Sequence, residues 1–125
     1  LIGRWTTVSN NPKIIFDAAH NLAGFKSISS ELDKLKYNQL HIILAFIKGK
    51  NISELISTLP LNSNIYYTSI NMERGMTQSE IIQNVGRSII FDENPKRLLD
   101  TVKGHCSDQD IILITGSNFI AKSIL

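Results

Sequence analysis

Residues 13–21 of the chain read Lys-Ile-Ile-Phe-Asp-Ala-Ala-His-Asn, a short apolar run that ends in a polar turn. The run at residues 13–16 predicts a buried strand, and the turn begins at Asp17. After the turn, apolar residues recur at spacings of three and four, which predicts one buried face of a helix. They are Phe25, Ile28, Leu32 and Leu35. Strand, polar turn and helix form the unit that the chain then repeats.

The same alternation continues to the end of the chain. Four more strand-like runs lie at residues 41–46, 64–69, 88–91 and 111–114. Between them lie helix-start signals, each a capping side chain or a capping box. These are Asn51 with Glu54, Thr77 with Glu80, and Asn94 with Pro95. We expect Pro60 to end the helix after Asn51, and a last helix to begin within residues 115–118 and to be still running at Leu125.

Apolar strands that alternate with helices are typical of a parallel sheet covered on both faces. Right-handed crossovers then place helices on both sides of that sheet. We therefore predict an α/β fold, a three-layer Rossmann-like domain with a mostly parallel sheet and helices on both faces. Residues 1–125 form one domain in this interpretation, with residues 1–11 as a lead-in or linker and residues 5–8 as a candidate edge strand.

Length and composition fit one folded domain. The 125 residues are 42% hydrophobic and 19% charged, which differs from the composition of disordered chains. The net charge of +2, from 13 basic and 11 acidic residues, is too even for a nucleic-acid footprint, so no nucleic-acid partner is expected. No apolar run approaches the length of about 18 residues that a membrane span needs, so no membrane association is expected either.

A single cysteine, Cys106, excludes an intrachain disulfide and a zinc cluster built from several cysteines. No metal site is expected from the sequence. A reducing, cytoplasmic setting is the corresponding expectation. The first residues, Leu1 to Trp5, lack the basic leader and apolar core of a signal peptide, and without an initiator Met the chain is expected to be a fragment.

Polar residues follow each predicted strand, where open α/β sheets bind their ligands. They are Asp17, His20 and Asn21 after the first strand, Lys48 and Lys50 after the second, Arg74 after the third, and Thr115, Gly116 and Ser117 after the last. Cationic side chains close to helix N-termini favour the binding of a ligand with a carboxylate or a phosphate group. The chain contains neither G-x-G-x-x-G nor G-x-x-x-x-G-K-[ST], so by motif it is no self-sufficient dinucleotide binder or P-loop nucleotidase.

Each of these residues also has a purely structural interpretation. Asp17 can cap the following helix, His20 can be a hydrogen-bonded turn residue, and Ser117 can be the N-cap of the last helix. The cations after the second and third strands can be solvated surface charges. Two further histidines, His41 and His105, are expected to be structural or exposed. Cys106 has no base near it in sequence, which argues against a catalytic nucleophile.

Three motifs in order are more specific than any single residue. Gly3-Arg4 comes first, then residues 17–21 with Asp-Ala-Ala-His-Asn, then Thr115-Gly116-Ser117. In this combination the sequence resembles the C-terminal domain of folylpolyglutamate synthase/dihydrofolate synthase, a family of the Mur ligase superfamily. The resemblance covers essentially all 125 residues. Leu22 stands where the family usually has proline, and residues 48–51, Lys-Gly-Lys-Asn, stand where it usually has Asp-Lys-Asp.

The resemblance implies an ATP-dependent ligase that joins L-glutamate to a folate, to dihydropteroate, or to both. In the family, an N-terminal ATPase domain holds the P-loop, most of the Mg²⁺ ligands and most of the folate pocket, and the C-terminal domain closes over it. ATP phosphorylates the acceptor carboxylate, and the amine of glutamate attacks the acyl phosphate. The chain alone is therefore expected to be inactive without that N-terminal domain.

Residue roles follow from the same resemblance. Arg4 and Asp17 are expected to contact the nucleotide, His20 to be catalytic and near the incoming glutamate, and Ser117 to bind glutamate. Possible further contributors are Asn21, Lys50 and Arg74. Two other functions remain open: the C-terminal domain of a peptidoglycan-precursor Mur ligase, and a non-catalytic α/β ligand-binding module.

Overall fold

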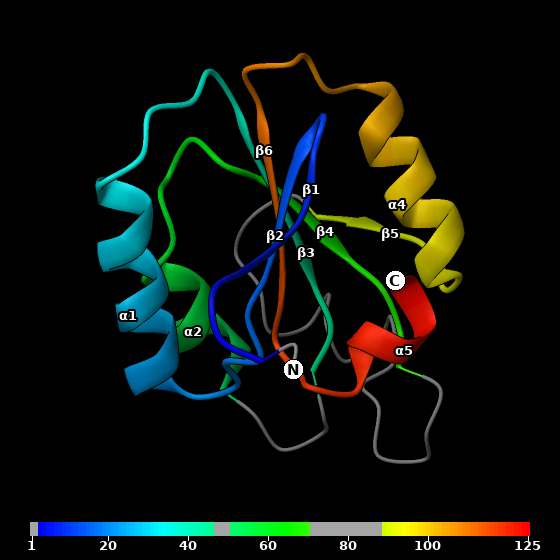
Figure 1. Ribbon diagram of the computed structural model, residues 1–125. Coiled ribbons are helices and arrows are strands. Elements are labelled where there is room, and N and C mark those ends of the chain that lie inside the picture. Colours follow the sequence, from blue (N-terminus) through cyan, green and yellow to red (C-terminus); the bar gives the residue numbers. More distant parts are fainter. Residues whose placement is uncertain (1–2, 47–50, 71–88) are drawn as a thin grey trace.

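The computed structural model describes residues 3–46, 51–70 and 89–125, which contain one six-stranded sheet in the order β1-β2-β6-β3-β4-β5 (Figure 1). The strands are β1 Thr6–Asn10, β2 Lys13–Phe16, β3 Leu40–Leu44, β4 Asn64–Tyr67, β5 Ile90–Phe91 and β6 Ile111–Thr115. The edge strand β1 pairs antiparallel with β2, and every other pair is parallel. The predicted mostly parallel sheet is confirmed, with its edge strand over residues 6–10.

Helices cover both faces of this sheet. They are α1 Leu22–Asp33, α2 Ile52–Ser57, α4 Pro95–Gly104 and α5 Ile120–Ile124. Figure 1 shows α1 and α2 on one side of the sheet and α4 and α5 on the other. The predicted three-layer arrangement is therefore confirmed. Within the described ranges, no helix has the length and apolar character needed to cross a membrane.

The two central strands explain the apolar runs in the sequence. All five residues of β3 and all five of β6 are buried, because each strand has neighbours on both sides and helices on both faces. Successive side chains alternate between two cores. Ile42 and Leu113 belong to the core beneath α1 and α2, whereas Ile43 and Ile112 belong to the core beneath α4 and α5.

Several element boundaries differ from the sequence-based expectation. Strand β3 covers residues 40–44 rather than 41–46, although the next two residues are also buried. Helix α1 ends at Asp33, so Leu35 packs against the core from outside the helix. Helix α2 ends at Ser57, before Pro60 is reached. The helix predicted after Thr77 lies outside the described residues.

Two of the predicted caps are confirmed by hydrogen bonds. Asn51 Oδ1 accepts from the backbone N–H of Glu54 at 3.3 Å, and Asn94 Oδ1 accepts from that of Arg97 at 3.0 Å. Each bond satisfies an N–H group that lacks a partner inside its helix. Pro95 occupies the first turn of α4, where a missing N–H costs nothing.

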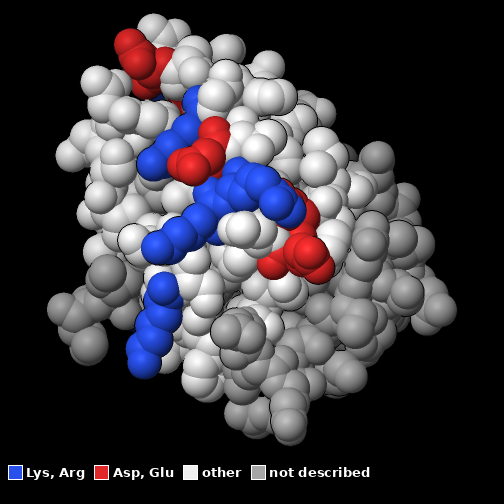
Figure 2. Space-filling view, turned by 90° about the vertical axis from the view of Figure 1, so that its right-hand side faces the viewer, with Lys and Arg blue, Asp and Glu red and all other residues white. Residues whose placement is uncertain are grey.

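The face formed by α4 and α5 carries charges of both signs, as Figure 2 shows. Arg97 makes a two-pronged contact with Asp92 there, with Nε at 2.8 Å from Oδ2 and Nη2 at 2.7 Å from Oδ1. These bonds, together with the N–H of Asn94, lower the pKa of Asp92 from 3.8 to about 2. The ionised carboxylate of Asp92 therefore stabilises the start of α4.

We expect Asp92→Asn to reduce stability at neutral pH and to have less effect in acid. Because the folded-state pKa is depressed, the contribution is fully present above the ordinary value of 3.8 and disappears as the pH falls towards 2. Urea unfolding at pH 7 and at pH 2 measures this, with Asp100→Asn on the same helix as the control. If the free energies of unfolding of wild type and Asp92→Asn differ by the same amount at both pH values, this role of Asp92 is contradicted.

Candidate functional site

The turn after β2 is organised by the carboxylate of Asp17, which is buried. Its Oδ2 accepts from the backbone N–H of Trp5 at 3.0 Å, and its Oδ1 accepts from that of Ala19 at 2.8 Å. The backbone N–H of Asp17 donates to the carbonyl oxygen of Ile114 on β6 at 3.0 Å. One side chain thus fastens the start of the chain to the turn, and the backbone fastens the turn to the centre of the sheet.

Arg4 is brought to this turn by the same contacts. The backbone N–H of Ala18 donates to the carbonyl oxygen of Gly3 at 2.7 Å, directly before Arg4, and the Asp17 carboxylate holds the next residue, Trp5. The Arg4 side chain is exposed. A guanidinium held at its base and free at its tip can form two parallel hydrogen bonds to a phosphate or a carboxylate.

A hollow of about 340 Å³ opens beside the turn, at the N-terminus of α1. Arg4, Asp17, His20 and Asn21 contribute to its lining. The His20 side chain is exposed and forms no hydrogen bond with the residues that the structure describes. Asn21 caps α1, with its Oδ1 accepting from the N–H of Gly24 at 2.9 Å. A cation, a titratable imidazole and a helix N-terminus therefore share one concave surface, which suits an anion.

Ser117 lies next to this turn but not in the lining of the hollow. The backbone N–H of Gly116 donates to the carbonyl oxygen of Ala19 at 3.0 Å, and the Thr115 hydroxyl contacts the same oxygen at 3.4 Å. The Ser117 side chain is buried, and its Oγ accepts from the N–H of Phe119 at 3.1 Å. The first and last loops of the sheet are thus joined through the backbone.

Gly116 is required at this junction. Its φ is +107°, and a Cβ at this position would lie 2.5 Å from the carbonyl oxygen of Ala45. The backbone N–H of Ala45 also donates to the carbonyl oxygen of Thr115 at 3.2 Å. A side chain would separate the end of β6 from the segment that follows β3.

The structure decides between several interpretations left open by the sequence. Asn21, not Asp17, caps α1, so the capping role considered for Asp17 is wrong. Phe119 is the N-cap of α5, which begins at Ile120 and ends at Ile124, so the expected start within residues 115–118 and the N-cap role of Ser117 are wrong. The Ser117 hydroxyl still bonds to the Phe119 N–H. Lys48, Lys50 and Arg74 lie outside the described residues.

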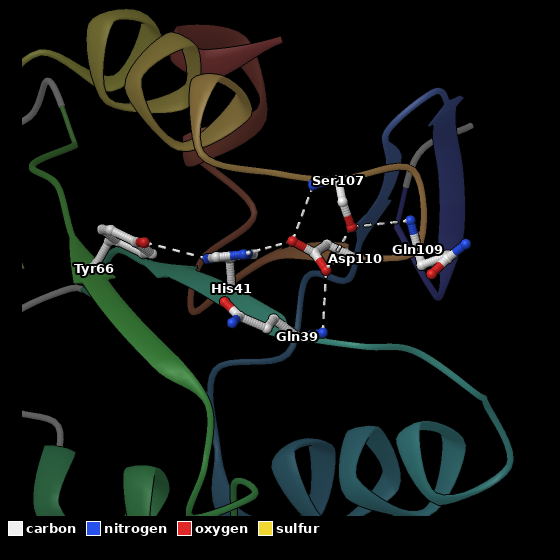
Figure 3. A network of polar contacts seen from close by, with 6 residues as sticks. All are labelled: Gln39, His41, Tyr66, Ser107, Gln109 and Asp110. Atoms are coloured by element: carbon white, nitrogen blue, oxygen red, sulfur yellow. Dashed lines mark hydrogen bonds and ion pairs between the residues drawn. The ribbon is translucent and has the colours of Figure 1, made fainter.

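A second polar cluster occupies the opposite edge of the sheet, where the strands begin (Figure 3). His41 Nε2 lies 3.3 Å from Asp110 Oδ2, and His41 Nδ1 lies 3.2 Å from the Tyr66 hydroxyl. Asp110 also accepts from the backbone N–H of Gln39 and from both the N–H and the hydroxyl of Ser107, each at 3.1 Å. His41 is buried and hydrogen bonded, which confirms its structural interpretation, and His105 is exposed at the end of α4.

Cys106 belongs to the same cluster. Burial and the nearby charge of Asp110 raise the pKa of its thiol, which disfavours the reactive thiolate and agrees with the expectation that Cys106 is no nucleophile. Sequence reasoning did not find this cluster, because His41 and Cys106 come from opposite halves of the chain. A polar residue within the strand-like run at residues 41–46 was the one available signal.

Comparison with known protein families gives a match over nearly the whole chain. The family model described as "Mur ligase, glutamate ligase domain" matches residues 3–118. Among curated proteins, the dihydrofolate synthase/folylpolyglutamate synthase of Buchnera aphidicola subsp. Baizongia pistaciae is 31% identical over 120 residues. That alignment covers 94% of this chain and 28% of the relative.

Solved structures show the same fold. An E. coli FolC structure in complex with ADP, without folate substrate, matches with a TM-score of 0.86 and 22% identity. A bifunctional folylpolyglutamate synthase/dihydrofolate synthase with Mn, AMPPNP and L-glutamate bound matches with a TM-score of 0.87 and 19% identity. Each match covers 98% of this chain and 30% of the solved chain, so this chain spans less than a third of the proteins it resembles.

We expect Asp17→Asn to destabilise the protein by about 1–3 kcal/mol, because an amide offers one acceptor oxygen where two backbone N–H groups need one each. Chemical unfolding measures the loss. Asp33→Asn, at the exposed end of α1, serves as the matched control and should change little. Equal stability of the two variants would show that the two bonds to Asp17 contribute nothing.

We expect Gly116→Ala to cost at least about 2 kcal/mol, because it combines a positive φ with a clash against backbone. Gly104→Ala is the control. It lies at the end of α4 with nothing within 4 Å of the added Cβ, and alanine there should stabilise the helix by about 0.5–1 kcal/mol. Thermal unfolding of both variants should give shifts of opposite sign, and shifts of the same sign contradict this explanation.

Proposed function

The chain belongs to the family of Mur ligase glutamate ligase domains, and from this premise we propose that it is the C-terminal part of an ATP-dependent ligase. The proposed reaction adds L-glutamate to a folate, to dihydropteroate, or to both. One observation carries the proposal: Arg4, Asp17, His20 and Asn21 share one hollow at the N-terminus of α1. The 31% identical relative is a dihydrofolate synthase/folylpolyglutamate synthase, which supports this acceptor class.

The rest of the proposed enzyme lies in an N-terminal ATPase domain. Two facts support this division. The chain spans 28% of its 31% identical relative, and its sequence contains no P-loop. In this proposal residues 1–125 form one domain, and its first part, the lead-in over residues 1–11, connects it to the ATPase domain and also supplies the edge strand β1. The cytoplasmic location expected from the single cysteine stays a prediction.

ATP binds between the two domains in this proposal, with its phosphates reached by the Arg4 guanidinium. The solved structures of the same fold are complexed with ADP and with AMPPNP, which supports a nucleotide as one of the ligands. Asp17 contributes to nucleotide binding by positioning Arg4. Both of its carboxylate oxygens already accept backbone N–H groups, and one of these bonds holds Trp5, the residue next to Arg4. Arg4 is thus the binding residue and Asp17 the positioning residue.

Mg²⁺ finds no complete ligand set in this hollow. The hollow has one carboxylate among its described residues, and that carboxylate is engaged by the backbone. Octahedral Mg²⁺ needs several oxygen ligands and is held by carboxylates together with substrate phosphates. We assign the ion to the ATPase domain, where it would neutralise phosphate charge.

The chemistry proposed for this chain is the positioning of glutamate. ATP first phosphorylates the acceptor carboxylate, and the amine of glutamate then attacks the acyl phosphate and displaces phosphate. His20 is exposed at the mouth of the hollow, where its imidazole can accept a proton from the attacking amine. The Ser117 side chain is buried outside the lining of the hollow, so its proposed contribution to the glutamate site is to support the turn to which Gly116 joins it. Holding the two reactants together lowers the barrier chiefly by entropy. Lys50 and Arg74 stay candidate contributors.

The acceptor can be tested directly in the full-length enzyme that contains this chain. Purified enzyme with ATP and L-glutamate is assayed on dihydropteroate, on a folate and on a UDP-muramoyl precursor. We expect ADP release with at least one of the first two and none with the third. Turnover of the muramoyl precursor alone would identify a peptidoglycan-precursor ligase, and no turnover of any would favour a non-catalytic binding module.

We expect His20→Ala and Ser117→Ala in that enzyme to lower kcat/KM for glutamate by about tenfold or more, with a smaller effect on KM for ATP. His105→Ala and Ser30→Ala, both exposed away from the hollow, are the controls. The 125-residue chain alone should show no ligation. Wild-type glutamate kinetics in both site variants would contradict the assigned roles.

A further inference from the structure

The cluster at the opposite edge of the sheet brings three kinds of metal ligand together. His41, Cys106 and Asp110 each offer one ligand atom, and these atoms all lie within 4.8 Å of one another. They come from three places in the fold: the start of β3, the segment after α4, and the residue before β6. We propose that His41, Cys106 and Asp110 form a binding site for one zinc ion.

The spacing of the ligand atoms is close to what tetrahedral zinc needs. Zinc bonds of about 2.0–2.3 Å place neighbouring ligand atoms roughly 3.2–3.7 Å apart. His41 Nε2 and Asp110 Oδ2 are 3.3 Å apart, which already forms one edge of such a tetrahedron. Since all three ligand atoms lie within 4.8 Å of one another, the thiol has to approach by at most about 1 Å. Cys106 is half-buried in the non-helical segment between α4 and β6. A water molecule completes the fourth position.

The two buried ligands are held in place by hydrogen bonds from outside the site. Asp110 Oδ1 accepts from the Gln39 N–H and from the Ser107 hydroxyl, whereas Oδ2 accepts from the Ser107 N–H and faces His41 (Figure 3). When His41 Nδ1 carries the proton and donates it to the Tyr66 hydroxyl, Nε2 presents its lone pair to the ion. Outer hydrogen bonds of this kind fix ligand orientation in metal sites.

Burial also favours an ion here. His41 and Asp110 are 3% and 4% exposed, so water competes little for their ligand atoms. A set of one thiolate, one imidazole and one carboxylate suits zinc better than the all-oxygen sites of Mg²⁺ or Ca²⁺. The bound ion would tie α4 to the two central strands at the edge away from the ligase hollow. The zinc proposal therefore stands independently of the proposed function.

One competing arrangement has to be separated from this one. His105 is exposed and adjacent to Cys106 in sequence, so these two residues alone could hold a metal weakly at the surface. In that surface arrangement, the metal affinity depends on His105 and not on Tyr66. In the proposed site, the metal affinity depends on Tyr66 and not on His105.

The test is a Co²⁺ titration of the purified, reduced 125-residue chain, followed by displacement with Zn²⁺. We expect one ion per chain, a thiolate-to-cobalt charge-transfer band, the intense visible bands of tetrahedral cobalt, and loss of all of them on adding Zn²⁺. Zn²⁺ should also raise the thermal unfolding temperature, since the ion binds the folded state. Cys106→Ser should weaken binding by more than about 100-fold, and Tyr66→Phe, which removes an outer hydrogen bond, by about 10-fold to 100-fold.

His105→Gln is the matched control and should bind Co²⁺ as the wild type does. Circular dichroism of each variant without metal verifies that it is folded. Cys106→Ser should disturb the fold least among the ligand substitutions, because the Cys106 side chain is only half-buried. Three results overturn the proposal: no charge-transfer band in the wild type, unchanged affinity in folded Cys106→Ser, or loss of binding in His105→Gln with none in Tyr66→Phe.

Discussion

Strand β6 connects the two edges of the sheet, and the polar groups at both edges depend on its position. It is hydrogen bonded to β2 on one side and to β3 on the other, and all five of its side chains are buried. Its carboxyl end continues into Gly116, whose backbone contacts Ala45 and donates to Ala19. Its amino end begins after Asp110, which holds His41. A shift of β6 would therefore disturb both the hollow at the N-terminus of α1 and the polar cluster around His41.

The hollow owes its form mainly to backbone contacts. Asp17 uses both carboxylate oxygens to hold N–H groups, and the Gly116 N–H joins the last loop to the first. The side chains that face outward, Arg4 and His20, are the exposed ones. Such a division leaves these two side chains open to a ligand while the turn beside them is fixed, which is the arrangement that pre-organised sites need.

The two edges of the sheet differ in a way that matches their proposed tasks. The carboxyl edge presents exposed polar groups and a helix N-terminus, and it is the edge at which open α/β sheets bind their ligands. The amino edge buries its polar groups and satisfies them with one another, as His41, Asp110 and Tyr66 do. Buried and mutually bonded groups stabilise a fold or hold an ion, whereas exposed groups meet a substrate.

The sequence by itself determined the three-layer fold, since apolar strands alternate with amphipathic helices, and it placed Asp17, His20 and Asn21 together because they share one turn. It also located the starts of α2 and α4 through the caps Asn51 and Asn94. It did not locate the start of α5 at Ile120, which depends on contacts around Gly116 and Ser117. Only the tertiary structure decided that Asp17 is held by backbone and that His41 meets Cys106 and Asp110. The spacing of apolar residues indicates which face of a helix or strand is buried. Contacts between residues far apart in the sequence, such as His41 and Asp110, depend on the order of the strands in the sheet.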